Sequence, residues 1–310
     1  MVDKNSTRKK VLLTGATGFI GQHCLRELIQ EGYDIIATYH ARIPETEHPE
    51  QVKWVQVDLT DDLKPVEDIL CATPIDTLLH VAWNMGKGYQ NNAENTIWLE
   101  KSVELVSLFI KHGGNRVATA GTNAEYAISQ HELKEDGPLN PDTLYGKCKR
   151  SLYMEVEQLC KAKQISYVHM RIFYTFGKGE SEIRVIPYVI DELLAGRSPI
   201  CSSGVQVLDY MCVEDIARAI VQCLKRKDLH GSINIGSGEG VELRDLLTFI
   251  ADKIDGDTKI TFAKEKPGDR KIDVADVSRL REAVGFVPSM SRDEAILRYI
   301  KQRKEQAVQK

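Results

Sequence analysis

Residues 11–21, which read VLLTGATGFIG, constrain the fold of this chain more than any other stretch. An apolar run ends in three glycines spaced three apart, and an amphipathic helical pattern follows. This order predicts a strand, a tight loop and a helix, because glycines allow the turn, a close approach to a pyrophosphate and the packing of helix on strand. Free N–H groups at the helix start would face the anion. We therefore expect a dinucleotide phosphate to contact Gly15, Thr17, Gly18, Phe19, Ile20 and Gly21.

The patterns that follow this loop predict an α/β fold. Amphipathic helical segments alternate with apolar runs at 34–39, 52–57, 77–83, 116–121 and 167–173. Strands that alternate with helices form βαβ units, which predicts a Rossmann-type, doubly wound parallel sheet. We expect residues 1–176, with the interleaved segment 205–236, to form this dinucleotide-binding domain. Residues 177–204 and 237–310 are expected to form a smaller α+β substrate-binding cap.

Composition argues against several classes of protein. The chain has 310 residues and a net charge of −4, so it offers no basic surface for nucleic acid. No apolar run approaches the roughly 20 residues that span a bilayer, and the opening residues are polar, so we expect a cytoplasmic protein without membrane contact. Neither a C-x-x-C pair nor a His cluster accompanies the cysteines, which argues against a metal site and against disulfides. The seven cysteines are Cys24, Cys71, Cys148, Cys160, Cys201, Cys212 and Cys223.

The tip of the second predicted strand bears on the choice of dinucleotide. An NAD site of this kind has an acidic residue there for the ribose hydroxyls, whereas this chain has Tyr39, His40 and Arg42. Arg42, with His40, could meet a 2′-phosphate, which favours NADP over NAD; alternatively, Arg42 is a solvated loop charge. Asp58, followed by Leu59 at the end of the third strand, is either an acceptor for the adenine amino group or a helix cap.

The run 77–83 predicts a buried parallel strand that ends at the same edge of the sheet. Its single histidine, His80, is predicted to be a core residue with satisfied hydrogen bonds. Ligands bind outside the carboxyl ends of parallel strands, so we expect Lys87, in the loop that follows, to contact the substrate. The last residues of the run are expected to contact the cofactor, namely Val81, Ala82 and Trp83.

Tyr145 and Lys149 are the first candidates for chemistry. They are four residues apart in a helical pattern, which places both side chains on one face. A free phenol has a pKa near 10, and a neighbouring ammonium favours its phenolate. Tyr145 could then exchange a proton with a substrate oxygen while hydride moves to or from a nicotinamide. A solvated helix face is the alternative, because Y-x-x-x-K also occurs by chance.

The combination of these features resembles the extended short-chain dehydrogenase/reductase family, that is, the NAD-dependent epimerase/dehydratase family. The resemblance covers nearly the whole chain. It includes the glycine loop, Asp58 with Leu59, Thr122 with Tyr126, Tyr145 with Lys149, 171–177, 209–217, 234–238 and 266–269. The resemblance implies that Thr122 hydrogen-bonds the substrate oxygen, that Tyr145 is the acid/base, and that Lys149 binds the ribose and lowers the tyrosine pKa.

Departures from the family pattern bear on the reaction. Family 4,6-dehydratases carry Asp-Glu directly after the Ser/Thr, where this chain has Asn123 and Ala124, which disfavours dehydration. Segments 82–89 and 120–126 are similar to the branch of 4-ketoreductases of nucleotide-linked deoxysugars. We therefore expect NADPH-dependent reduction of a 4-keto-6-deoxyhexose. The alternatives are a nucleotide-sugar epimerase, a reductase of a smaller carbonyl compound and a non-catalytic dinucleotide-sensing protein.

The substrate side of the site is less regular. Family members that bind nucleotide sugars have an arginine where this chain has Leu208, so the diphosphate clamp is incomplete. A cation such as Arg184, Lys266 or Arg270 could replace it, unless these are solvated surface charges. We expect substrate contacts from Lys87, Thr122, Asn123, Tyr174, Arg184 and Lys266. The helices 95–111 and 145–160 are expected to form a homodimer interface, as is common in this family.

Overall fold

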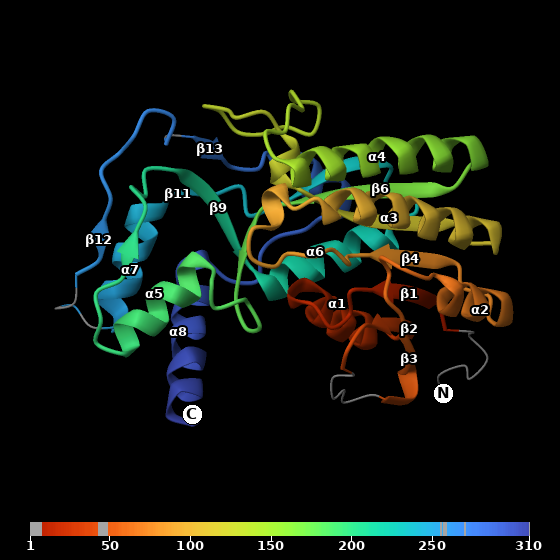
Figure 1. The fold of residues 1–310 in the computed structure, drawn as a ribbon, viewed down its shortest axis with the longest axis horizontal. Helices are drawn as coiled ribbons and strands as arrows, with labels where there is room; N and C mark the ends of the chain where they lie inside the picture. The colour runs from red at the N-terminus through yellow and green to blue at the C-terminus, as the bar shows by residue number, and fades with distance from the viewer. Residues whose placement is uncertain (1–7, 43–48, 255, 257–258, 270, 310) are drawn as a thin grey trace. The chain divides into compact units, whose positions relative to one another are not determined.

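The computed structural model describes residues 8–42, 49–254, 256, 259–269 and 271–309. The chain divides into two compact units (Figure 1). The first comprises residues 1–125, 139–171 and 217–233, and the second comprises residues 126–138, 172–216 and 234–310. These bounds differ from the expected domains in that 126–138, 172–176, 205–216 and 234–236 belong to the second unit.

The first unit is built on a seven-stranded sheet in the order β10-β6-β5-β4-β1-β2-β3, which confirms the Rossmann-type fold. The pairs β1–β2, β1–β4, β2–β3 and β4–β5 are parallel. The strands are β1 (Lys10–Thr14), β2 (Asp34–Tyr39), β3 (Val52–Gln56), β4 (Thr77–His80), β5 (Arg116–Thr122), β6 (Ser166–Ile172) and β10 (Gly231–Ile235). Every residue of β4 and β5 is buried, as their largely apolar runs predict, whereas β3 at the edge has exposed residues at Lys53 and Gln56.

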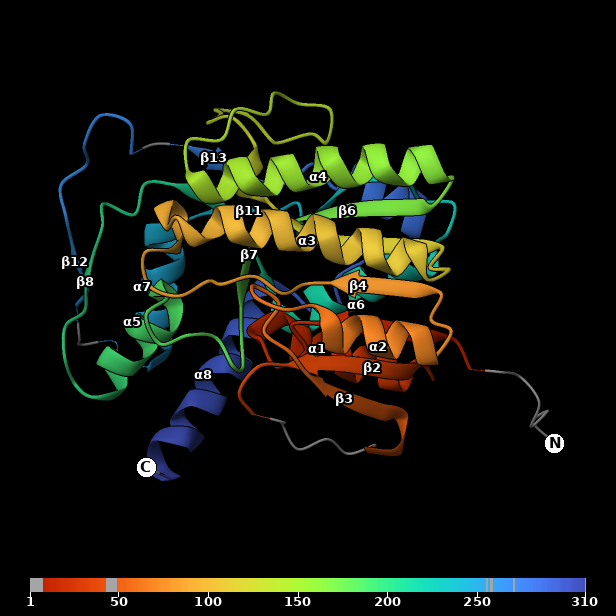
Figure 2. The same cartoon turned by 45° about the vertical axis from the view of Figure 1, so that its right-hand side comes forward.

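Helices cover this sheet, and one group of them forms a shared core with it. Side chains of α2, α3 and α4 pack against the strands through residues such as Phe109 and Leu152, and α3 and α4 lie side by side (Figure 2). The helices are α1 (Phe19–Gln30), α2 (Lys64–Ala72), α3 (Glu94–Lys111), α4 (Leu144–Lys163) and α6 (Val213–Lys225), with short helices at Pro49–Gln51, Tyr89–Asn91 and Asn123–Glu125.

The second unit has a mixed sheet and its own core. Strand β9 (Val207–Cys212) pairs in parallel with β7 (Tyr174–Phe176) and β13 (Ile272–Asp273), and antiparallel with β11 (Gly240–Glu242). Its core includes Phe176, Leu247 and Ile296. The remaining elements are β8 (Ile200–Cys201), β12 (Thr261–Phe262), α5 (Val185–Leu194), α7 (Leu243–Ile254), a π-helix (Leu280–Val284) and α8 (Arg292–Gln309). Within the described ranges of the two units, no helix combines the length and the apolar character needed to cross a bilayer.

Candidate active site

The loop between β1 and α1 has the geometry of a phosphate cradle. Gly15 has a φ of 72°, and a Cβ added there would lie 2.7 Å from the backbone nitrogen of Ala82. A Cβ at Gly21 would lie 1.8 Å from the carbonyl oxygen of Gly15, so the helix packs directly on the turn. No described side chain caps α1, and its first turn contains no acidic residue. The helix start therefore suits an anion, as the sequence predicts.

The ends of β2 and β3 carry the groups expected at the adenosine end of a dinucleotide. Tyr39 packs edge-on against Trp54, with ring centroids 6.2 Å apart. Arg42 is exposed and pairs with no residue that the structure describes. Asp58 Oδ1 accepts hydrogen bonds from the backbone N–H and hydroxyl of Thr60, at 2.9 and 2.6 Å, and these bonds lower the pKa of Asp58. Asp58 thus caps a turn, and its Oδ2 lies 3.6 Å from His40 Nε2.

Leu59 and the end of β4 complete this edge. Leu59 is buried in the core of the first unit, as is Ala82, while Val81 is half-buried. His80 is a core residue, which confirms its prediction: its Nδ1 lies 2.7 Å from Thr14 Oγ1 and its Nε2 2.8 Å from Ser102 Oγ. Burial, aided by the charge of Lys149, lowers the pKa of His80 to about 3. The histidine is therefore a neutral link between strands.

Trp83 lies between the end of β4 and the start of α4. Its Nε1 donates a hydrogen bond to Asn95 Oδ1 at 2.8 Å, and Asn95 in turn donates to the carbonyl oxygen of Tyr89 at 2.7 Å. The indole ring meets Tyr145 edge-on, with centroids 6.2 Å apart, and Tyr89 meets the same tyrosine at 5.1 Å. Aromatic rings thus hold the buried Tyr145 from two directions.

Lys149 is buried against the same rings. Its Nζ lies 3.9 Å from the centroid of Trp83 and 5.9 Å from that of Tyr145, and it donates a hydrogen bond to the carbonyl oxygen of Ala120 at 2.9 Å. Burial lowers the pKa of Lys149 to about 7, while the negative charge of Glu125 opposes that shift. The structure therefore brings Tyr145, Lys149 and Trp83 together, and their helix face is not a solvated one.

Thr122 ends β5 beside the start of α4. A Cβ added at Gly146 would lie 2.2 Å from the carbonyl oxygen of Ala124, so α4 packs directly on the turn that follows Thr122. Thr122 Oγ1 accepts from the Ala124 N–H at 3.2 Å and lies 3.3 Å from Asn123 Oδ1, to which it donates. The hydroxyl is held by weak bonds that a ligand oxygen can replace.

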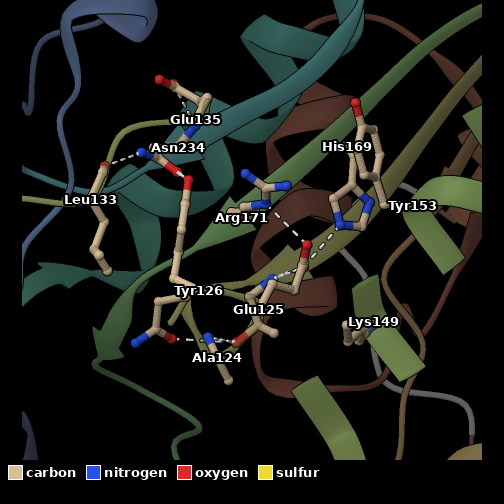
Figure 3. A network of polar contacts seen from close by, with 12 residues as sticks. Ala124, Glu125, Tyr126, Leu133, Glu135, Lys149, Tyr153, His169, Arg171 and Asn234 are labelled. Carbon is tan, nitrogen blue, oxygen red and sulfur yellow. Dashed lines mark hydrogen bonds and ion pairs between the residues drawn. The ribbon is translucent and has the colours of Figure 1, made fainter. Parts of the chain in front are cut away.

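A buried cluster of Glu125, His169 and Arg171 was not predicted from the sequence (Figure 3). The carboxylate of Glu125, fully buried, lies 2.9 Å from His169 Nε2 and accepts from Arg171 Nε at 3.0 Å and from the Thr122 N–H at 2.8 Å. One signal was available. His169 and Arg171 alternate in a strand pattern that is otherwise apolar, so they share a face, and buried charges require partners.

The other expected substrate residues are spread over both units. Lys87 is exposed and lines a small pocket of the first unit with Asn84, Tyr89 and Trp98. In the second unit, the hydroxyl of Tyr174 donates to Asp273 Oδ2 at 2.8 Å.

The remaining candidates of the second unit are cations, together with the residue that replaces the family arginine. Arg184 precedes α5 and is half-buried, whereas Lys266 is exposed. Leu208 is buried in the core of that unit, and Arg270 lies outside the described residues. Among the residues that the structure describes, no three His, Cys, Asp or Glu side chains are grouped as metal ligands.

Comparison with known proteins assigns the chain to a family. Residues 11–236 match the NAD dependent epimerase/dehydratase family. CDP-abequose synthase of Salmonella typhimurium (strain LT2) is 25% identical over 305 residues, which cover 95% of this chain and 98% of that protein. The dTDP-4-dehydro-6-deoxyglucose reductase of Escherichia coli is 23% identical over 311 residues, which cover 96% and 98%.

A solved structure agrees with these matches. UDP-N-acetylglucosamine 4-epimerase from Methanobrevibacter ruminantium M1, in complex with UDP-N-acetylmuramic acid, superimposes with a TM-score of 0.86 at 25% identity. The match covers 97% of this chain and all of that one. The family match extends over most of the chain and includes the glycine loop, Thr122, Tyr145 and Lys149. This chain therefore belongs to the NAD dependent epimerase/dehydratase family of enzymes.

Proposed function

We propose that this protein reduces the keto group of a nucleotide-linked deoxysugar, a 4-keto-6-deoxyhexose, with NADPH as reductant. The observation that carries the proposal is the buried ammonium of Lys149, which lies 5.9 Å from the ring of Tyr145. An ammonium in this position favours the phenolate form of a tyrosine, and a phenol tuned in this way can exchange protons near neutral pH. Reduction needs only such a proton donor, an oxygen partner and a hydride source.

In the proposed reaction, Tyr145 donates its proton to the carbonyl oxygen of the substrate. Thr122 Oγ1 gives up its 3.3 Å contact with Asn123 and donates to the same oxygen, where it stabilises the charge that develops. NADPH, when bound, supplies the hydride that adds to the carbonyl carbon, so ketone, hydride and proton together give the secondary alcohol. Lys149 would hold the nicotinamide ribose, and solvent would return a proton to Tyr145.

The residues at the sheet edge fit a dinucleotide. Gly15 and Gly21 leave no room for side chains, and the uncapped start of α1 can receive the pyrophosphate together with Thr17, Gly18, Phe19 and Ile20. Asp58 Oδ2, which Thr60 does not use, would accept from the adenine amino group beside Leu59. Arg42 would meet the 2′-phosphate of NADP with His40, next to Tyr39.

The substrate class follows from the relatives and from the cations of the chain. Two relatives bear names that include a CDP- or a dTDP-linked sugar, which supports a nucleotide-linked substrate. Because Leu208 is a core residue, we assign the diphosphate to Arg184 and Lys266, and the sugar to Lys87, Asn123 and Tyr174.

Cofactor oxidation tests this proposal. The purified protein, given NADPH and CDP-, dTDP- or GDP-linked 4-keto-6-deoxyhexoses, should consume NADPH faster than NADH. Arg42→Ala should raise the KM for NADPH roughly tenfold and leave that for NADH unchanged, because only NADPH carries the 2′-phosphate. Consumption of NADPH with small ketones alone would refute the sugar assignment, and an equal preference for NADH would refute the role of Arg42.

A second candidate function is epimerisation of a nucleotide sugar. It is favoured by the likeness, at a TM-score of 0.86, to a 4-epimerase. Such an enzyme would retain NAD through purification and interconvert two sugar isomers without net change in the cofactor. Release of the cofactor from denatured protein, identified by mass, separates this candidate from the reductase.

We also propose that the enzyme is a cytoplasmic homodimer through α3 and α4. Ile97 on α3 and Met154 on α4 are 43% and 54% exposed, and both are large apolar side chains that a partner copy would cover. Light scattering after size exclusion should give twice the 34.9 kDa mass of the chain. The Met154→Glu variant should shift that mass toward the monomer.

A further inference from the structure

Glu125 occupies an unusual position for a carboxylate. It lies three residues after Thr122, the last residue of β5, at the end of the short helix Asn123–Glu125, and it is completely buried. One oxygen, Oε1, accepts from the Thr122 N–H at 2.8 Å and lies 2.9 Å from His169 Nε2, while Oε2 accepts from Arg171 Nε at 3.0 Å. Both oxygens are therefore used.

The partners of Glu125 are themselves fixed. His169 Nδ1 lies 2.7 Å from Thr119 Oγ1 and 3.2 Å from the hydroxyl of Tyr167. A Cβ added at Gly121 would lie 2.3 Å from His169 Nε2 and 2.6 Å from Glu125 Oε1, so the network closes tightly on the backbone of β5. The carboxylate consequently has one available position, and the peptide N–H of Thr122 is tied to it.

The same carboxylate acts on Lys149. The groups that face the ammonium are the rings of Trp83 and Tyr145, the carbonyl oxygen of Ala120 and the neutral His80. None of these carries a negative charge, and Glu125 supplies the one that opposes the effect of burial on Lys149. Burial would raise the pKa of Glu125, but its contacts with His169, Arg171 and the Thr122 N–H together hold that pKa below its usual value.

We infer that Glu125 is a positioning residue of the site, which fixes the backbone of Thr122 by hydrogen bonding and places a negative charge against Gly121, next to the Ala120 carbonyl that Lys149 binds. This inference rests on the roles proposed for Thr122 and Lys149. Glu125 itself touches neither substrate nor cofactor. It acts on the reaction through Thr122 and Lys149, the two residues that are proposed to contact them.

Two variants separate the effect of the charge of Glu125 from the effect of the position of its carboxylate. Glu125→Gln keeps the shape and removes the charge, so Lys149 should lose its proton at a pH about one unit lower than in the wild type. Glu125→Asp keeps the charge and withdraws the carboxylate from Thr122. In this variant kcat should fall roughly 10- to 100-fold, with the KM for the substrate and the titration of Lys149 little changed.

The titration is read without turnover, from the ¹³Cε signal of lysine in the labelled protein as pH is varied. Lys149→Met identifies the signal by its loss. Glu155→Gln is the matched control, because its carboxylate lies exposed on the same helix, so it should not move the signal.

Each result decides. An unchanged Lys149 titration in folded Glu125→Gln, or wild-type kcat in Glu125→Asp, would overturn the inference. If Glu125→Gln does not fold, Glu125→Asp still tests the inference, because its kcat should fall while its KM stays near the wild-type value. If the wild type turns over no ketosugar, the proposed substrate fails while the ¹³C titration still decides on Glu125.

Discussion

Two buried carboxylates, one in each unit, are held in contrasting ways. Glu125 of the first unit contacts the guanidinium of Arg171 at 3.0 Å and the ring of His169 at 2.9 Å. Asp209 of the second unit has no cation among its described partners. Its Oδ1 accepts from the backbone and hydroxyl of Ser237, at 2.9 and 2.5 Å, and its Oδ2 accepts from the N–H groups of Gly238 and Ala275, at 2.9 and 3.3 Å.

The two arrangements have opposite electrostatic results. Burial would raise the pKa of either carboxyl, and it does raise that of Asp209, because neutral donors compensate only in part. At Glu125 the contacts with His169, Arg171 and the Thr122 N–H outweigh burial, and the pKa falls below its usual value. Two equally buried carboxylates therefore differ in role. Glu125 stays ionised near Thr122, whereas Asp209 joins the backbone of residues 237–238 to that of Ala275 by hydrogen bonds.

The largest effect is expected from removal of the fixed charge. Glu125→Ala leaves the guanidinium of Arg171 buried without its counter-charge, removes the partner of His169 and opens a cavity, so the free energy of unfolding should fall by about 3–5 kcal/mol. Urea unfolding measures this loss, with Glu155→Ala at an exposed position of α4 as the control that should stay within about 0.5 kcal/mol. A loss below about 1 kcal/mol would mean that the cluster is not a coupled buried network.

Lys149→Met should change the pH dependence of stability. The folded pKa of about 7 lies below the ordinary 10.5, so the cost of burying the ammonium is complete below pH 7 and is relieved as the pH rises toward 10.5. The variant has no such cost. Its advantage over the wild type should therefore shrink by roughly 2–3 kcal/mol between pH 7 and pH 9. Urea unfolding at both values tests this, and a constant difference would contradict a buried, titrating lysine.

Asp209→Asn should cost less than the loss of Glu125. The amide leaves one pair of N–H donors without an acceptor, at about 1–3 kcal/mol, but it also removes a charge that burial disfavours. We expect a net loss of about 1–2 kcal/mol in urea unfolding. A loss as large as that of Glu125→Ala would remove the distinction between the two carboxylates.

The smallest expected effect is on stability at acid pH, where Glu125 and Asp209 should contribute with opposite signs. The pKa of Glu125 is lowered by folding, so its contribution is present above 4.5 and is lost as the pH falls through the folded value. The pKa of Asp209 is raised above 3.8, so folding gains stability as the pH falls through its folded value. Relative to the wild type, Glu125→Gln should flatten the acid limb of stability and Asp209→Asn should steepen it. Shifts of the same sign in both variants would contradict these directions.

The sequence predicts the sheet and the cofactor loop because both depend on local patterns. Continuous apolar runs mark β4 and β5, and the spacing of Gly15, Gly18 and Gly21 specifies a turn that only glycines can make. The helix spacing of Tyr145 and Lys149 likewise predicts their shared face. Each of these features lies within about ten residues of chain.

Features assembled from distant residues could not be predicted in the same way. Glu125 meets His169 and Arg171 across more than 40 residues, and local patterns give no pairing between them. The segment 126–138 was expected in the first domain, yet Leu133 exchanges backbone hydrogen bonds with Val274 and Asp276 and belongs to the second unit. Asp58 was open between an adenine contact and a helix cap; it caps the turn at Thr60 and not the helix α2, whose N-cap residue is Leu63, and the adenine contact stays a prediction.

Isotope transfer tests the proposed function most directly. NADPH deuterated at the transferable position of the nicotinamide is supplied with the nucleotide-linked 4-keto-6-deoxyhexose that the enzyme consumes, and the sugar product is weighed by mass spectrometry. Reduction through Tyr145 predicts one deuteron per product at the former carbonyl carbon, and no product with Tyr145→Phe. An isomerised sugar that carries no deuterium and forms without loss of NADPH would contradict the reductase and leave the epimerase in its place.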